Sequence, residues 1–192
     1  MRALRTALAV AALAPALAPG VGFAQAAERS PFHARQWGAD FVVAFGFAGA
    51  GAIRFMAPDR AVVMDLQGDI STSTSNGGGA RGNVNSAELS LGVRRYRGLA
   101  PSVQLFHTLG LQVDYSHSYA AAGPTTTNGW GAGVFGDLGA GWMVSPHLMV
   151  GASWRVDALY THTSTMTPGG TTSGHQLELS FGAVSLMGQL FF

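Results

Sequence analysis

Apolar and polar residues alternate along most of the chain with a period of two residues. Between residues 130 and 142, bulky residues such as Trp130, Val134 and Leu138 occupy even positions, while Gly131 and Asp137 occupy odd ones. The same alternation occurs in residues 37–47, 62–70, 88–94, 104–114, 148–160 and 176–192. Because successive side chains of a β-strand point to opposite faces, this period predicts strands with one apolar and one polar face.

Short proline turns divide the alternating segments into pairs. Pro58, Pro101 and Pro146 recur at nearly equal intervals, and each interval holds a polar stretch between two alternating segments. These stretches, rich in Ser, Thr, Gly and Asn, cover residues 71–86, 116–129 and 161–174. A shorter unit, with residues 46–51 between its halves, precedes Pro58. Four pairs predict an up-and-down meander of eight antiparallel strands, with short turns on one rim and long polar loops on the other.

Most of the charge falls on the polar face of these strands. The acids that share it are Asp40, Asp65, Asp69, Glu88, Asp114, Asp137, Asp157 and Glu178. Arg54, Arg94 and Arg155 fall there too, among Gly, Ser, Gln and Thr. Small and polar residues suit the crowded interior of a narrow barrel, so we predict an all-β fold, an eight-stranded antiparallel up-and-down transmembrane β-barrel. Because buried charges need partners, we expect these arginines to bridge carboxylates in a hydrated lumen.

Composition separates this prediction from its alternatives. A soluble barrel or sandwich would show Lys and Glu at most outward positions, yet charged residues make up only 11% of the chain and lysine is absent. After the first 26 residues, the longest apolar run, residues 41–53, contains three glycines and is shorter than the ~20 residues of a spanning helix. The absence of cysteine excludes disulfides and thiol chemistry, and a formal net charge of +1 gives no basic face for nucleic acid.

The first 26 residues have the features of a signal peptide. Arg2 and Arg5 form a positive start, an Ala- and Leu-rich stretch follows, and Ala24-Gln25-Ala26 fits the cleavage pattern. A retained anchor helix is the alternative, which Pro15 and Pro19 disfavour. We therefore expect residues 1–26 to be a leader and residues 27–192 to form a single barrel domain.

Two positions depart from the regular pattern. In the last segment, the apolar residues Leu177 to Phe181 are odd-numbered, while Val184 to Phe192 are even-numbered. An extra residue near Gly182-Ala183 would restore the alternation, so we predict a β-bulge there. His107 falls on the apolar face by parity, where an imidazole is unexpected.

The chain resembles the small eight-stranded outer-membrane β-barrels of the OmpA/OmpX/OmpW-like group. The resemblance rests on the end of the leader at Ala24-Gln25-Ala26, on the meander, and on the final Gly188-Gln189-Leu190-Phe191-Phe192. It implies a monomer in the outer membrane of a Gram-negative bacterium, in contact with lipid and lipopolysaccharide and without a cofactor. It also implies that the barrel-assembly machinery recognises the C-terminal Phe192. Because such barrels serve many roles, we expect a structural or surface-interaction protein without catalysis.

A narrow cation-preferring channel is one alternative function. Eight strands enclose a lumen that side chains largely fill. Small inward residues such as Gly131, Gly133, Gly139 and Ser153 leave room for water beside the acids. An ion path of this kind would favour cations.

A lipid A deacylase-like enzyme is the other alternative. Such outer-membrane barrels use a His-x-Ser pair with a downstream Glu, which His162, Ser164 and Glu178 resemble. The chemistry needs a histidine within reach of the serine hydroxyl and a carboxylate that orients the histidine. Thr165 stands where that family has Asn.

No catalytic, cofactor or metal site is predicted from the remaining motifs. His117, His162 and His175 are expected at the external rim, but their spacing matches no metal motif. The Gly-rich residues 71–79 lack the lysine of a phosphate-binding loop.

Overall fold

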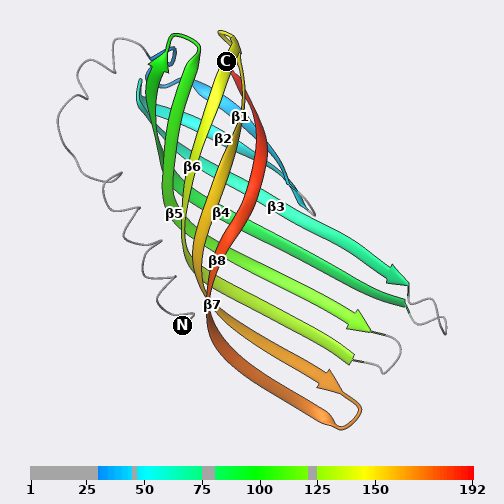
Figure 1. Ribbon diagram of the computed structural model, residues 1–192. Helices are drawn as coiled ribbons and strands as arrows, with labels where there is room; N and C mark the ends of the chain where they lie inside the picture. The colour runs from blue at the N-terminus through cyan, green and yellow to red at the C-terminus, as the bar shows by residue number, and fades with distance from the viewer. Residues whose placement is uncertain (1–29, 45–46, 75–80, 121–124) are drawn as a thin grey trace, which may run out of the picture.

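The computed structural model describes residues 30–44, 47–74, 81–120 and 125–192, which form a closed antiparallel barrel in which each strand pairs with its neighbours in sequence (Figure 1). The strands are β1 (Trp37–Ala44), β2 (Phe47–Ala57), β3 (Arg60–Thr74), β4 (Arg81–Ala100), β5 (Val103–Ala120), β6 (Thr125–Ser145), β7 (Leu148–Thr167) and β8 (Gly170–Phe191). Pairing of β1 with β8 closes the ring. The predicted eight-stranded up-and-down barrel is confirmed, while the expected leader, residues 1–26, lies outside the described residues.

The proline turns gather at one end of the barrel, which we call the turn end. Residues 58–59, 101–102 and 146–147 join β2 to β3, β4 to β5 and β6 to β7. Proline suits such turns because its ring presets φ near −65°. The backbone of Trp37 exchanges hydrogen bonds of 3.2 and 3.0 Å with Phe192, so the C-terminus is also at this end. The predicted short turns on one rim are confirmed.

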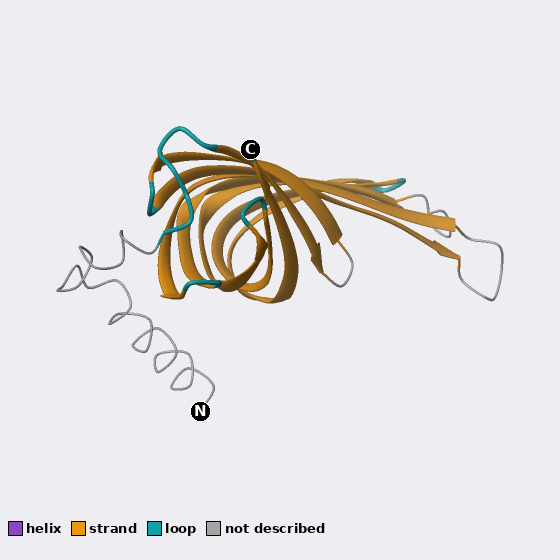
Figure 2. Cartoon of the chain, turned by 90° about the horizontal axis from the view of Figure 1, so that it is seen from above, coloured by secondary structure: helices purple, strands orange, loops and turns teal. Residues whose placement is uncertain are grey.

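The polar stretches that were expected to be loops are mostly strand, so that prediction was wrong. Ser71 pairs with Val84 in the β3–β4 ladder, and Thr165 pairs with Thr172 in the β7–β8 ladder. Paired backbones and the strand preference of threonine let each ladder continue where the side chains no longer alternate in polarity. Figures 1 and 2 show these hairpins extending away from the barrel; we call this the hairpin end.

The first hairpin also differs from the prediction. Its link was expected at residues 46–51, but β1 ends at Ala44 and β2 begins at Phe47. Gly49 and Gly51 therefore lie within β2, against β3. A Cβ atom on Gly49 would lie 2.6 Å from Cγ of Gln67, so this glycine makes room for an inward side chain instead of forming a turn.

The predicted bulge in β8 is confirmed. Trp154 of β7 pairs with Val184 and Val156 pairs with Phe181, so β8 contains one residue more than its partner over this interval. Because of the extra residue, Phe181 and Val184 are both exposed on the outer wall. The bulge thus keeps one apolar face along the whole strand.

The two strand faces have the predicted polarity over most of the barrel. Exposed apolar side chains cover the outer wall, among them Met64, Leu66, Leu91, Leu109, Leu111, Val134, Val150, Leu179 and Leu186. The inward positions between them hold buried polar residues such as Asp65, Gln67, Ser90 and Gln112. His107 lies on the outer wall, as its parity indicates, in an apolar groove with Leu138 and Trp154.

Candidate functional site

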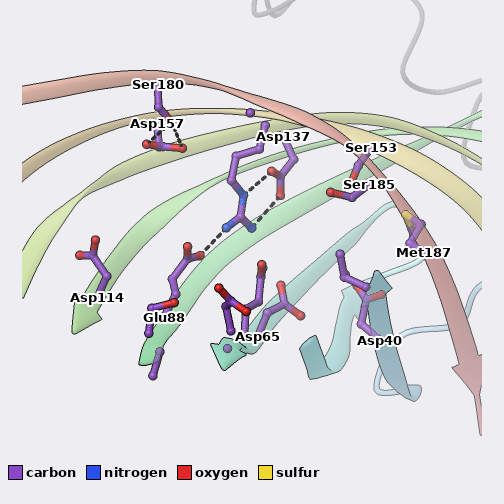
Figure 3. Close-up of a pocket in the computed structure, with 18 of the residues that line it drawn as sticks. Asp40, Asp65, Glu88, Asp114, Asp137, Ser153, Asp157, Ser180, Ser185 and Met187 are labelled. Carbon is purple, nitrogen blue, oxygen red and sulfur yellow. Dashed lines mark hydrogen bonds and ion pairs between the residues drawn. The ribbon is translucent and has the colours of Figure 1, made fainter. Parts of the chain in front are cut away.

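A polar cavity of about 340 Å³ lies inside the barrel (Figure 3). Its acidic lining residues come from six strands and are Asp40, Asp65, Asp69, Glu88, Asp114, Asp137 and Asp157; its basic ones are Arg94 and Arg155. Seven of the eight acids that were predicted to point inward therefore share this cavity. The eighth, Glu178, is exposed nearer the hairpin end. With seven carboxylates beside two guanidinium groups, the cavity favours cations and water.

Arg94 holds four strands together across the lumen. Its Nη1 donates to Oδ2 of Asp40 at 2.8 Å, and its Nε donates to Oγ1 of Thr108 at 2.9 Å. Nε2 of Gln189 donates to the same Asp40 oxygen at 2.9 Å. The guanidinium also lies 4.7 Å from the ring centroid of Phe106. These contacts join β1, β4, β5 and β8 through a fully buried ion pair.

Arg155 bridges two carboxylates, as predicted. Its Nε donates to Oδ1 of Asp137 at 2.8 Å, and its Nη1 donates to Glu88 (Figure 3). Its guanidinium stacks 4.3 Å from the ring centroid of Phe135. Asp157, further along the cavity, accepts from the Ser180 hydroxyl at 2.8 Å. Arg155 therefore connects β7 to both β4 and β6.

Arg54 does not point inward, so the prediction for this residue was wrong. It is exposed on the outer wall, and its guanidinium lies 5.1 Å from the Trp37 ring centroid. Its neighbours Ile53 and Phe55 are the inward residues and are completely buried. Near the turn end the interior of the barrel is apolar, so here the inward face of the strand is apolar and its outward face carries the charge. The long arginine side chain can place its charge at the edge of the apolar band.

An aromatic cluster fills the lumen at the turn end. It consists of Phe32, Phe55, Tyr96, Phe106 and Phe191, whose neighbouring ring centroids are 4.5 to 5.9 Å apart. Aliphatic side chains pack around it: Ile53, Val63, Met149 and Met187. This cluster was not predicted from the sequence, although the inward parity of Phe55 and Phe106 is a signal that could have revealed it. The cluster separates the polar cavity from the turn end.

Phe32 enters this cluster from the segment that precedes β1. It is only 1% exposed. The backbone amide of Arg35 donates to the Phe55 carbonyl at 2.8 Å, and the Phe55 amide donates to the Gln36 carbonyl at 2.9 Å. These bonds continue the pairing of β1 with β2 beyond Trp37 and hold the segment at the mouth of the barrel, where the Phe32 ring joins the cluster.

The His162, Ser164 and Glu178 combination is not assembled. His162 and Ser164 lie two residues apart on the same face of β7, as expected. Glu178 pairs instead with Leu159, so strand parity places it on the face opposite His162, although both residues line a polar cleft of about 200 Å³ together with Asp114. No described contact joins the carboxylate to the imidazole, so the geometry gives the serine no oriented base.

The three histidines expected at one rim divide into a pair and a single residue. His162 and His175 are direct cross-strand partners, and their Nδ1 atoms lie 3.2 Å apart. His117 instead contacts Oδ1 of Asn128 through Nδ1 at 2.7 Å. Within the described residues, no group of three or more His, Cys, Asp or Glu side chains is arranged to hold a metal ion.

Comparisons with known proteins identify the fold. No protein-family model and no curated protein matches the chain. A major outer membrane protein from Thermus thermophilus superposes with a TM-score of 0.56 at 13% identity, over 83% of this chain and 100% of that one. The outer membrane protein OprG from Pseudomonas aeruginosa gives 0.56 at 14% identity, over 84% of this chain and 98% of that one. Among the described residues, no helix is both long and apolar enough to cross a membrane. The chain has the fold of the small outer-membrane β-barrel proteins.

Proposed function

We propose that this protein is a monomer in the outer membrane of a Gram-negative bacterium, exported by a leader at residues 1–26. The apolar outer wall is suited to contact lipid and lipopolysaccharide. Exposed Trp37 and Trp142 lie near the turn end, while Tyr115, Trp130 and Tyr160 lie toward the hairpin end. Two such aromatic belts are typical of the two interfaces of a membrane barrel. The exposed C-terminal Phe192 is the expected contact for the barrel-assembly machinery.

We further propose a structural or surface-interaction role without catalysis. Strand length is the observation that carries this proposal. Strands β4 to β8 contain 18 to 22 residues, whereas a tilted strand crosses the bilayer in about 9–11. The residues beyond this number form paired, Ser- and Thr-rich hairpins at the end opposite the proline turns. In the membrane these hairpins would stand outside the cell, where they can meet a partner.

Shortened hairpins test this proposal. In the test variant the hairpins are cut back to the cross-strand pairs Ile70 with Asn85, Ser116 with Gly129, and Thr163 with Gly174, and each is closed by Asn-Gly. Cells that produce the shortened protein should lose the surface adhesion or autoaggregation of cells with the full chain. A structural role of the barrel predicts that both proteins protect the membrane equally against detergent. If adhesion, autoaggregation and detergent resistance are the same with the full chain, the shortened chain and no chain, the proposal is wrong.

A narrow cation-preferring channel is the second candidate. The specific observation in its favour is the excess of carboxylates over guanidinium groups in the lumen. The aromatic cluster opposes conduction, because it fills the lumen between the polar cavity and the turn end. A current in planar bilayers therefore requires that the cluster be displaced, and any such current should favour cations.

A further inference from the structure

The outer face of the β7–β8 hairpin carries two imidazoles in direct contact. His162 and His175 are cross-strand partners, with ring centroids 4.4 Å apart and Nδ1 atoms 3.2 Å apart. We propose that this pair binds a divalent transition-metal ion through both Nδ1 atoms. The inference is independent of the proposed surface role, because it rests on the pair itself.

The spacing of the two nitrogen atoms suits one metal ion. With metal–nitrogen bonds of about 2.0–2.1 Å, the 3.2 Å separation sets a nitrogen–metal–nitrogen angle of roughly 100°, close to tetrahedral. Without metal, one Nδ1–H can donate to the other Nδ1. When the ion binds, that proton moves through solvent to Nε2 of the same ring, so that both Nδ1 lone pairs face the ion.

Neighbouring aromatic rings hold the two imidazoles in place. The Tyr160 ring stacks on His175 at 5.7 Å with an interplanar angle of 19°, and Trp130 lies 5.8 Å from His162. Packing of this kind limits ring rotation before the ion arrives, which lowers the entropy cost of binding. His175 remains exposed, so an ion from solution can reach the pair.

The donor set defines the class of ion. Two neutral imidazoles suit copper, nickel and zinc, with Cu²⁺ the tightest of these divalent ions. Calcium and magnesium prefer oxygen ligands and should not compete. Because the protein supplies two ligands, water completes the coordination and the ion remains exchangeable.

Copper titration of the folded protein in zwitterionic detergent, without a histidine tag, tests the site. Heat-modifiable gel mobility first shows that each variant is folded. We expect saturable 1:1 binding that quenches Trp130 fluorescence, and an electron paramagnetic resonance signal with two nitrogen ligands. His162→Gln and His175→Gln should each weaken binding at least tenfold, since even outer-shell changes at metal sites cost about 10–100-fold.

A matched control separates this site from general histidine binding. His117→Gln changes a histidine at the same end of the barrel, one that contacts Asn128 instead of another imidazole. It should leave copper affinity within twofold, and excess Ca²⁺ should displace no copper. The proposal is overturned if the protein does not bind copper, if neither pair variant weakens binding, or if His117→Gln weakens it as much as they do.

Discussion

Arg94 and Asp40 form an ion pair of 2.8 Å across the lumen, although they are 54 positions apart in the chain. Their side chains are only 4% and 1% exposed. Removal of one partner leaves an uncompensated buried charge, whereas removal of both leaves none. The main effect of each partner on stability is therefore to compensate the buried charge of the other.

Loss of one charge of this pair should be more damaging than loss of both. Arg94→Met is expected to lower the free energy of unfolding by about 3–5 kcal/mol, and the double variant with Asp40→Leu should recover much of that loss. Urea unfolding of the barrel in lipid vesicles measures both values. Additive effects of Arg94→Met and Asp40→Leu would contradict this interpretation.

The aromatic cluster should control both stability and conduction. Phe32→Ala removes the ring that enters the mouth of the barrel, so we expect a loss of about 3–5 kcal/mol. We also expect cation-selective current in planar bilayers, where the unaltered protein should be silent. Phe41→Ala is the control, because Phe41 is an exposed phenylalanine on the outer wall of β1. Equal stability and equal silence of Phe32→Ala and the unaltered protein would show that the cluster does not close the lumen.

The two faces of the barrel could be predicted because, along most strands, apolar residues occupy positions of one parity and polar residues occupy positions of the other. Asp65, Asp137 and Arg155 point inward as expected, since the apolar outer wall and the narrow polar lumen impose opposite demands on neighbouring residues. The bulge at Gly182-Ala183 was predictable for the same reason. When the parity of the apolar residues shifts within one strand, an extra residue is needed to keep them all on one face.

The features that were not predicted lie where the two faces of a strand no longer differ in polarity. Beyond the apolar band, Thr165 and Thr172 face similar surroundings on both sides, so nothing in the pattern separates strand from loop. At the turn end the lumen is apolar, and for this reason the prediction put Arg54 on the wrong face. Contact between His162 and His175 depends on the register of two long strands, and the sequence alone does not specify that register.

Glycines on the two faces should respond differently to an added methyl group. A Cβ atom on Gly51 would lie 2.5 Å from the Met64 carbonyl oxygen and closer still to Asp65, so Gly51→Ala should destabilise the barrel by about 1–3 kcal/mol. Gly188 lies in the same barrel with no neighbour within 4 Å of its added Cβ atom. Gly188→Ala should therefore leave the urea midpoint unchanged or raise it slightly. A loss in Gly188→Ala as large as in Gly51→Ala would show that backbone freedom, not space, matters at Gly51.

The bulge in β8 makes one deletion tolerable. Without Ala183, Gly182 can pair with Arg155, while Phe181 still pairs with Val156 and Val184 with Trp154. The alternation is then regular and the apolar residues stay outside, so the deletion variant should refold and keep its heat-modifiable gel mobility. Deletion of Ala132 from β6, which has no bulge there, is the control. It would turn Asp137 onto the apolar outer wall and Leu138 into the lumen, because a shift of one residue exchanges the two faces. We expect the control to fail to refold; refolding of both deletions with equal yield would mean that face polarity does not set the register of this barrel.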